Sequence, residues 1–115
     1  MDIANFNADW LKAWSDKDVE RLVGFYAEDA TYFDPQVPNG LKGRGPLREY
    51  LKTLFSSTPA TTYTPEEVWA IEGGFCGRWY ADIGDDKVDA RLRGFDQVIL
   101  RDGLIAHNEV YVHQL

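Results

Sequence analysis

Apolar residues in the first half of the chain recur at the three- and four-residue spacing of amphipathic helices. This pattern predicts a helix from about residue 2 to residue 15, with a largely aromatic inward side. It predicts a second helix that starts from a cap at Asp16 or Asp18 and carries Tyr26 in its buried stripe. The inward residues of these two helices are Ile3, Phe6, Trp10, Ala13, Trp14, Val19, Leu22, Val23 and Tyr26.

A short strand, a loop and a third helix follow. The strand is predicted from Ala30 to Asp34, and it stops where Pro35 begins a segment rich in proline, asparagine and glycine. This segment, residues 36–45, is expected to be a loop at the rim of a pocket. The third helix begins at about Pro46, because proline is tolerated in the first helical turn. Its apolar face consists of Leu47, Tyr50, Leu51, Leu54 and Phe55.

Beyond residue 60 the spacing changes to the two-residue alternation of β-strands. Four strands are predicted, separated by turns rich in glycine and aspartate, and they form an antiparallel meander. Helices that precede such a meander are typical of an α+β fold, in which helices cover one face of a curved sheet and leave a pocket between. The predicted strands cover residues 61–73, 75–84, 87–100 and 104–115.

The strand at residues 87–100 carries one charged side chain, Asp96, on its apolar face. A carboxylate among apolar neighbours is expected to have a raised pKa and can stay protonated as a hydrogen-bond donor. A β-bulge at Gly94 would instead turn Asp96 outward. The other residues expected on the inner face of this strand are Val88, Ala90, Leu92, Gly94, Val98 and Leu100.

Composition and charge limit the partners. A chain of 115 residues with 44% hydrophobic content can build one domain with its own core. The net charge of −7 argues against a phosphate-binding surface, so nucleic acid is not expected as a partner. The single cysteine, Cys76, cannot form an internal disulfide, and neither an export signal nor an apolar run of membrane length is visible. We therefore expect a cytoplasmic protein that does not contact the membrane.

Three segments of the chain carry a resemblance: DVERLVGFYAEDATYFDP, GLKGRGPLREYL and the terminal strands. They resemble the NTF2-like superfamily, in particular its ketosteroid isomerase and SnoaL-like polyketide cyclase branch. The resemblance spans nearly the whole chain and implies one SnoaL-like domain over residues 1–115. The implied fold is a cone in which three helices pack on a curved, mostly antiparallel sheet and enclose a pocket.

The resemblance also implies a cofactor-free enzyme that transfers a proton on a small apolar carbonyl substrate. Asp34 matches the general base of the steroid isomerases, and Asp96 matches their protonated oxyanion-hole aspartate. One ionised and one protonated carboxyl group suit this chemistry, because negative charge develops on an oxygen in a water-poor site. Asp34 and Asp96 are therefore the predicted catalytic residues.

The pocket positions depart from the isomerases at the tyrosines. Trp10 stands where these enzymes carry the oxyanion-hole tyrosine of the first helix. Tyr26 matches a supporting tyrosine, but the third-helix tyrosine is replaced by Leu51, with Tyr50 one residue away. Aldol-type cyclisation or hydration is then as compatible with the residues as steroid isomerisation. The predicted substrate-binding residues are Trp10, Tyr26, Trp79 and Asn108.

Both carboxylates also have a structural interpretation. Asp34 in front of Pro35 could accept backbone N–H bonds in a turn, and Asp96 could pair with Arg91, Arg93 or another basic group. A non-catalytic domain of the same fold, used for binding a small ligand or for dimerisation, is the alternative function.

The outer face of the sheet is expected to carry both histidines, His107 and His113. No further ligands accompany His107 and Glu109, so no metal site is predicted. Aromatic and apolar side chains would also be exposed on this face of a monomer, which predicts a homodimer through the sheet. These side chains are Tyr80, Phe95, Ile99 and Tyr111.

Overall fold

The computed structural model describes residues 1–85 and 90–115. Two helices open the chain, a hairpin and a third helix follow, and the last four strands come after them. The helices are α1 (Ile3–Asp16), α2 (Val19–Val23) and α3 (Arg44–Ser57). The strands are β1 (Tyr26–Asp34), β2 (Val37–Lys42), β3 (Thr61–Ile71), β4 (Gly74–Ile83), β5 (Ala90–Arg101) and β6 (Leu104–Gln114).

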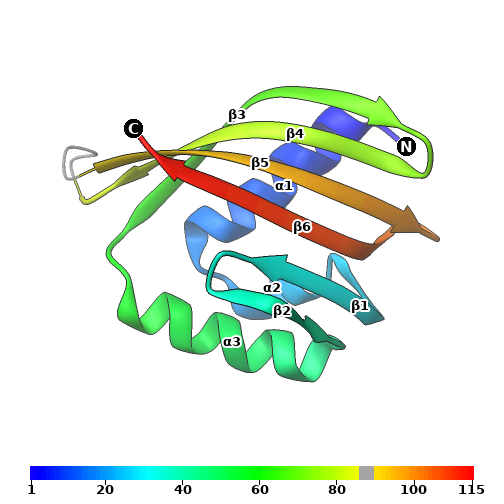
Figure 1. Ribbon diagram of the computed structural model, residues 1–115, viewed down its shortest axis with the longest axis horizontal. Coiled ribbons are helices and arrows are strands. Elements are labelled where there is room, and N and C mark those ends of the chain that lie inside the picture. The colour runs from blue at the N-terminus through cyan, green and yellow to red at the C-terminus, as the bar shows by residue number, and fades with distance from the viewer. Residues whose placement is uncertain (86–89) are drawn as a thin grey trace.

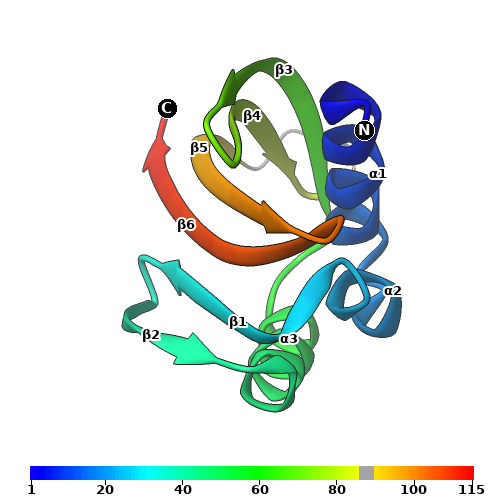
Figure 2. The same cartoon turned by 90° about the vertical axis from the view of Figure 1, so that its right-hand side faces the viewer.

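The strands form one curved sheet in the order β2-β1-β6-β5-β4-β3 (Figure 1). Neighbouring strands are antiparallel except β1 and β6, which are parallel. In Figure 2 the strands curve strongly, α1 runs alongside β3, and α3 lies beside β1 and β2. The predicted α+β fold, with helices packed on a curved and mostly antiparallel sheet, is confirmed.

Side-chain caps fix the starts of α1 and α2. The carboxylate of Asp2 accepts the backbone N–H of Asn5 at the start of α1, and Asp18 caps α2 in the same way. Lys17 ends α1 in the left-handed conformation, with φ of 53°. Its ammonium group donates to the last carbonyls of α3, where a cation is electrostatically favoured. None of the described helices has the length and the apolar run needed to cross a membrane.

The second helix is shorter than predicted. It ends at Val23, and Tyr26 belongs to β1 rather than to the helix, so that strand starts four residues before the predicted Ala30. The low helix propensity of Gly24 ends the helix. The error arose because β1 pairs irregularly with β6: Tyr26 lies opposite Ile105 and Thr31 lies opposite His107. This bulge removes the regular alternation by which a strand is recognised.

The predicted loop at residues 36–45 contains a strand, β2, which pairs with β1 as an antiparallel hairpin. Pro38 and Gly40 concealed it, because both residues disfavour strands. Proline is nevertheless tolerated at a sheet edge, where its missing N–H costs no ladder bond, and β2 is an edge strand. Gly40 has a φ of +84° and lies against the ring of Phe33.

The four-strand meander is present as predicted. Asp102 and Gly103, with φ of 54° and 79°, form the turn from β5 to β6, and two positive φ angles suit the twist of a hairpin. Val88, which was predicted to face inward, lies outside the described residues. Inward-facing side chains of β1, β4, β5 and β6 form the core with α1, α2 and α3. The largest fully buried ones include Trp10, Leu11, Leu22, Tyr26, Tyr32, Leu47, Leu51, Phe75, Val98 and Ile105.

The inward orientation of Asp96 is confirmed, since only 3% of the residue is exposed. Pairing between β4 and β5 runs without a register shift from Gly74 to Ile83, so Gly94 does not form a bulge. Gly94 instead makes room for the indole of Trp79: a Cβ at position 94 would lie 2.1 Å from a ring carbon. The missing side chain allows Trp79 to lie flat across β5.

A side chain at position 94 is expected to destabilise the fold by displacing this indole. Gly94→Ala should lower the free energy of unfolding by about 1–3 kcal/mol, as overpacked cores do. The matched control is Gly45→Ala, in the first turn of α3, where a Cβ meets no atom within 4 Å. That variant should be neutral or up to about 1 kcal/mol more stable. Urea unfolding of both measures the difference, and equal stabilities would contradict this role of Gly94.

Candidate functional site

A cavity of about 350 Å³ lies between α1, α3 and the sheet. Its wall is mainly aromatic and aliphatic, and two carboxylates, Asp34 and Asp96, reach it from different strands. Polar side chains such as Lys17, Gln36 and Gln114 also border it. The aromatic lining consists of Trp14, Tyr32, Tyr50, Phe55, Tyr63 and Trp79, and the aliphatic lining of Leu11, Leu54, Ile83, Leu92, Val110 and Val112.

Asp34, at the end of β1, accepts four hydrogen bonds. Its Oδ1 accepts the backbone N–H groups of Gln36 and Val37, at 2.8 and 3.1 Å. Its Oδ2 accepts the hydroxyls of Tyr32 and Tyr50, at 2.7 and 2.6 Å. The side chain therefore fixes the turn after β1 and also faces the cavity. Four converging donors match the acceptor-only character of an ionised carboxylate.

Tyr32 and Tyr50 were not predicted as site residues. Burial raises the pKa of Tyr32 well above its ordinary value, and the charge of Asp34 raises it further. Burial also raises the pKa of Tyr50, with the hydrogen bond to Asp34 as the second cause. Both phenols therefore keep their protons and act as donors. The sequence signals were present: Tyr32 and Asp34 are two residues apart on one strand, and Tyr50 lies on the apolar face of α3.

Asp96 has a different environment from Asp34. Trp79 Nε1 donates to its Oδ1 at 2.8 Å, and Asn108 Nδ2 donates to its Oδ2 at 3.1 Å. Burial raises the pKa of Asp96 to about 7, although these two donors oppose the rise and the charge of Asp34 adds to it. Near neutral pH, Asp96 is thus divided between the protonated and the ionised form. No pairing with Arg91 or Arg93 is seen; Arg91 pairs with Asp82 instead.

A buried polar chain continues behind Asp96. The Tyr26 hydroxyl donates to Asn108 Oδ1 at 2.9 Å, and both residues are completely buried. Burial raises the pKa of Tyr26 well above its ordinary value, and the charge of Asp96 adds to the rise. Tyr26 therefore stays a donor, and it fixes the Asn108 amide so that its NH₂ group faces Asp96.

Trp10 lies in the core, with 1% exposure, and its ring meets Phe75 edge to face. Its Nε1 has no hydrogen-bond partner of normal geometry among the described residues, although its proximity moderates the rise in the pKa of Tyr26. Trp10, Tyr26 and Asn108 are absent from the cavity lining, whereas Trp79, Asp34 and Asp96 belong to it. Direct contact of the first three with a substrate stays a prediction.

The hydrogen bonds of both histidines go to residues other than Asp34 and Asp96. His107 is on the outer face of the sheet, where its ring nitrogens contact Thr31 Oγ1 at 2.6 Å and Glu109 Oε2 at 3.0 Å. His113 pairs with Arg93 near the end of β6 and reaches the cavity mouth. Across residues 1–85 and 90–115, no three His, Cys, Asp or Glu side chains are grouped so that they could hold a metal ion.

Comparison with known families and structures agrees with this architecture. The SnoaL-like domain family matches residues 8–108. A steroid delta-isomerase from Pseudomonas aeruginosa is 21% identical with a TM-score of 0.69, over 96% of this chain and 79% of that one. SalBIII, described as an epoxide hydrolase/cyclase-like enzyme in pyran ring formation in salinomycin, is 22% identical with a TM-score of 0.76, over 96% and 89%.

An NTF2-like protein of unknown function from Burkholderia xenovorans is 17% identical with a TM-score of 0.77, over 98% of this chain and 84% of that one. No curated protein matches the chain significantly in sequence. At these identities, the likeness to solved structures establishes the fold.

The raised pKa of Asp96 predicts that stability falls as the pH rises. The ordinary pKa of an aspartate is 3.8 and that of folded Asp96 is about 7. Between these values the folded chain keeps a proton that the unfolded chain has lost, so raising the pH favours unfolding. The contribution of Asp96 to the free energy of unfolding should fall by a few kcal/mol over this range, since one unit of pKa shift corresponds to on the order of 1.4 kcal/mol. The fall should be absent in Asp96→Asn. Urea titrations from about pH 4 to pH 8 measure it, and parallel profiles for the two proteins would contradict it.

Proposed function

Since the chain belongs to the SnoaL-like domain family, we propose that it is a cofactor-free acid–base enzyme that moves a proton on a small apolar carbonyl substrate. One observation supports this proposal above all others. Two carboxyl groups of opposite character, Asp34 with four donors and Asp96 with a pKa of about 7, face one aromatic cavity. Two carboxyl groups in different environments can serve as base and acid, because one is ionised at the pH at which the other keeps its proton.

Asp34 is the general base in this proposal. It removes a proton from a carbon next to the substrate carbonyl and returns it to another carbon. Both of its oxygens already accept two hydrogen bonds, so one donor must move before a proton can be taken. Tyr50 is only partly buried, whereas Tyr32 is 2% exposed. We infer that substrate entry displaces the Tyr50 hydroxyl from Oδ2.

Asp96 is the acid. In its protonated form it donates a hydrogen bond to the substrate oxygen on which negative charge develops. Trp79 and Asn108 hold the carboxyl group in place from its other sides, so little reorganisation is needed during the reaction. Since the pKa of Asp96 is about 7, we expect turnover to decline as the pH rises through this value.

The cavity supports a compact, unsaturated substrate. Its volume of about 350 Å³ lies near the lower end of small-molecule sites. Six aromatic side chains line it, and their faces and edges favour flat rings. A carbonyl compound with one or more fused rings would bury its apolar surface against them and present its oxygen to Asp96.

Asp34→Asn is expected to lower kcat/KM by about 10²- to 10⁴-fold, the usual contribution of a general base. The assay is isomerisation of a Δ5-ketosteroid, with competition by equilenin, a steroid-like phenol, to follow binding separately. Equilenin should still bind to the variant. The matched control is Asp29→Asn, on the same strand, whose carboxylate is exposed and pairs with Arg101; it should behave as wild type.

Binding of equilenin without turnover in the wild type would favour the non-catalytic, ligand-binding alternative. Full activity in Asp34→Asn would rule out this residue as the base. A loss of turnover together with a loss of equilenin binding would point to an altered cavity rather than to a missing base.

We further propose that the chain forms a homodimer through the outer face of its sheet. Trp69, Phe95 and Tyr111 are 36%, 39% and 61% exposed. The rings of Trp69 and Phe95 lie 5.9 Å apart, and Phe95 is directly opposite Tyr111 across the β5–β6 pair. A contiguous aromatic patch of this kind is typical of an interaction surface.

Phe95→Lys should therefore shift the protein to a monomer, because it places a charge in the centre of this patch beside Arg78. Sedimentation velocity over a range of protein concentrations measures the change. Thr53→Lys, on the exposed side of α3, adds the same charge elsewhere and should leave the association unchanged. A wild type that sediments as a monomer at all concentrations would contradict the proposal.

A further inference from the structure

The cavity contains a phenol that no interaction described so far uses. Tyr32 and Tyr50 both donate their hydroxyl protons to Asp34. Tyr63, the third tyrosine of the lining, contributes only its backbone to the hydrogen bonds found within residues 1–85 and 90–115. Its hydroxyl is thus a donor for which the described part of the chain offers no hydrogen-bond acceptor.

The ring of Tyr63 lies next to the acid side of the site. Its centroid is 5.2 Å from that of Trp79, the indole that donates to Asp96, and 5.8 Å from that of Trp14. Burial raises the pKa of Tyr63 to about 12, and the charges of Asp96 and then Asp34 add to the rise. The hydroxyl therefore lies within electrostatic reach of both carboxylates and keeps its proton at neutral pH.

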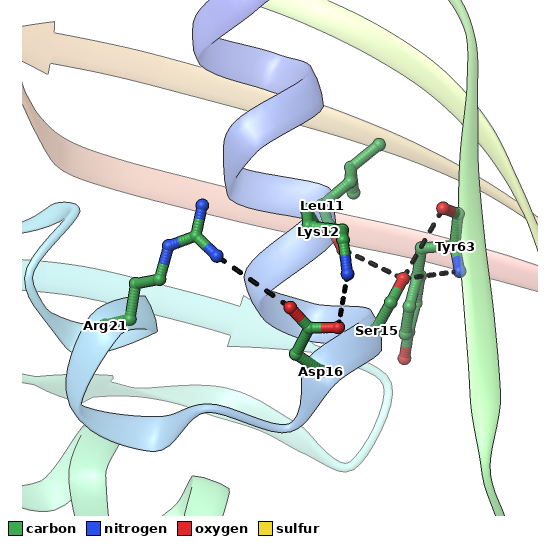
Figure 3. A network of polar contacts seen from close by, with 6 residues as sticks. All are labelled: Leu11, Lys12, Ser15, Asp16, Arg21 and Tyr63. Carbon is green, nitrogen blue, oxygen red and sulfur yellow. Dashed lines mark hydrogen bonds and ion pairs between the residues drawn. The ribbon is translucent and has the colours of Figure 1, made fainter.

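The backbone of Tyr63 is tied to the end of α1 (Figure 3). Its N–H donates to Ser15 Oγ at 2.9 Å, and the Ser15 hydroxyl lies 3.1 Å from the carbonyl of Leu11. The neighbouring Asp16 is paired with Lys12 at 2.6 Å. Anchored at its backbone and packed between two indoles, Tyr63 has little freedom to move, which suits a preorganised donor.

We infer that Tyr63 is a further catalytic residue: its O–H, together with the protonated Asp96, binds the substrate oxygen on which negative charge develops. This inference rests on the proposed acid–base function. It also accounts for Trp10, which stands at the position of the isomerases' first-helix tyrosine but is buried behind the cavity. The phenol that this chemistry uses would come here from β3 instead of α1.

The step is balanced without a co-reactant. As Asp34 takes a proton from carbon, the C–H electron pair forms a carbon–carbon double bond and the carbonyl π pair moves to oxygen. Tyr63 and Asp96 donate hydrogen bonds to that oxygen, and neither gives up its proton. When the proton returns from Asp34 to a second carbon, the carbonyl re-forms and all three groups are restored.

Tyr63→Phe keeps the ring and its packing and removes only the hydroxyl. We expect kcat for the Δ5-ketosteroid to fall by about 10²- to 10³-fold, the usual cost of losing one oxyanion donor, with a smaller change in KM. The dissociation constant for equilenin should rise about tenfold, and the ionised fraction of bound equilenin, read from its fluorescence, should fall. Tyr80→Phe, whose ring lies under Arg91 on the outer face, is the control and should match wild type.

The outcomes separate this inference from the proposed function. Unchanged kcat and equilenin binding in Tyr63→Phe would overturn the role of Tyr63, while inactivation by Asp34→Asn would leave the acid–base function standing. A wild type that neither binds equilenin nor turns over the steroid would overturn both. The urea midpoint of Tyr63→Phe should equal that of wild type, and a clear decrease would assign the hydroxyl a structural role instead.

Discussion

Burial of one carboxyl group, Asp96, is the constraint on which the site depends. A carboxylate removed from water must accept hydrogen bonds or take up a proton. Asp96 accepts hydrogen bonds from Trp79 and Asn108, and its pKa is nevertheless raised to about 7. Trp79 reaches it only because Gly94 has no side chain. Asn108 is oriented by Tyr26, which lies on the neighbouring strand β1. Four residues on four strands, Trp79, Gly94, Asn108 and Tyr26, thus build the environment in which the pKa of Asp96 is close to neutral pH.

The two carboxyl groups of the cavity are held by different means. Asp34 lies in a turn that holds it by backbone N–H groups, and tyrosines from β1 and α3 complete its surroundings. Asp96 lies in the middle of a regular strand and has only side-chain donors. A carboxylate at a turn retains many donors and suits the ionised form, whereas one in the sheet interior is poor in donors and suits the protonated form. The proposed division into a base and an acid therefore rests on where each residue lies in the fold.

Most of the fold was predicted from the regular spacing of apolar residues along the chain. The errors lie where strand pairing is irregular. Helices α1 and α3, the meander and the inward position of Asp96 follow from residue spacing alone. The start of β1 and the whole of β2 did not, because a bulge and the residues Pro38 and Gly40 interrupt the alternation. Tyr63 was missed for the same reason. A register shift between Pro65 and Glu67 reverses the faces of β3 midway, so a single alternation rule cannot assign both halves. The tyrosines around Asp34 come from separate elements, and their convergence depends on tertiary packing.

The clamp formed by Lys17 joins two helices beside the cavity. All three ammonium protons can be donated to the end of α3, to the carbonyls of Phe55 and Thr58 and to the hydroxyl of Thr58, and these residues border the cavity. The ammonium group therefore joins two helix ends, and its protons are donated to the end of α3 rather than into the cavity. With α1 and α3 tied together at this point, the width of the cavity between them is fixed by a helix-to-helix contact that the sheet does not provide.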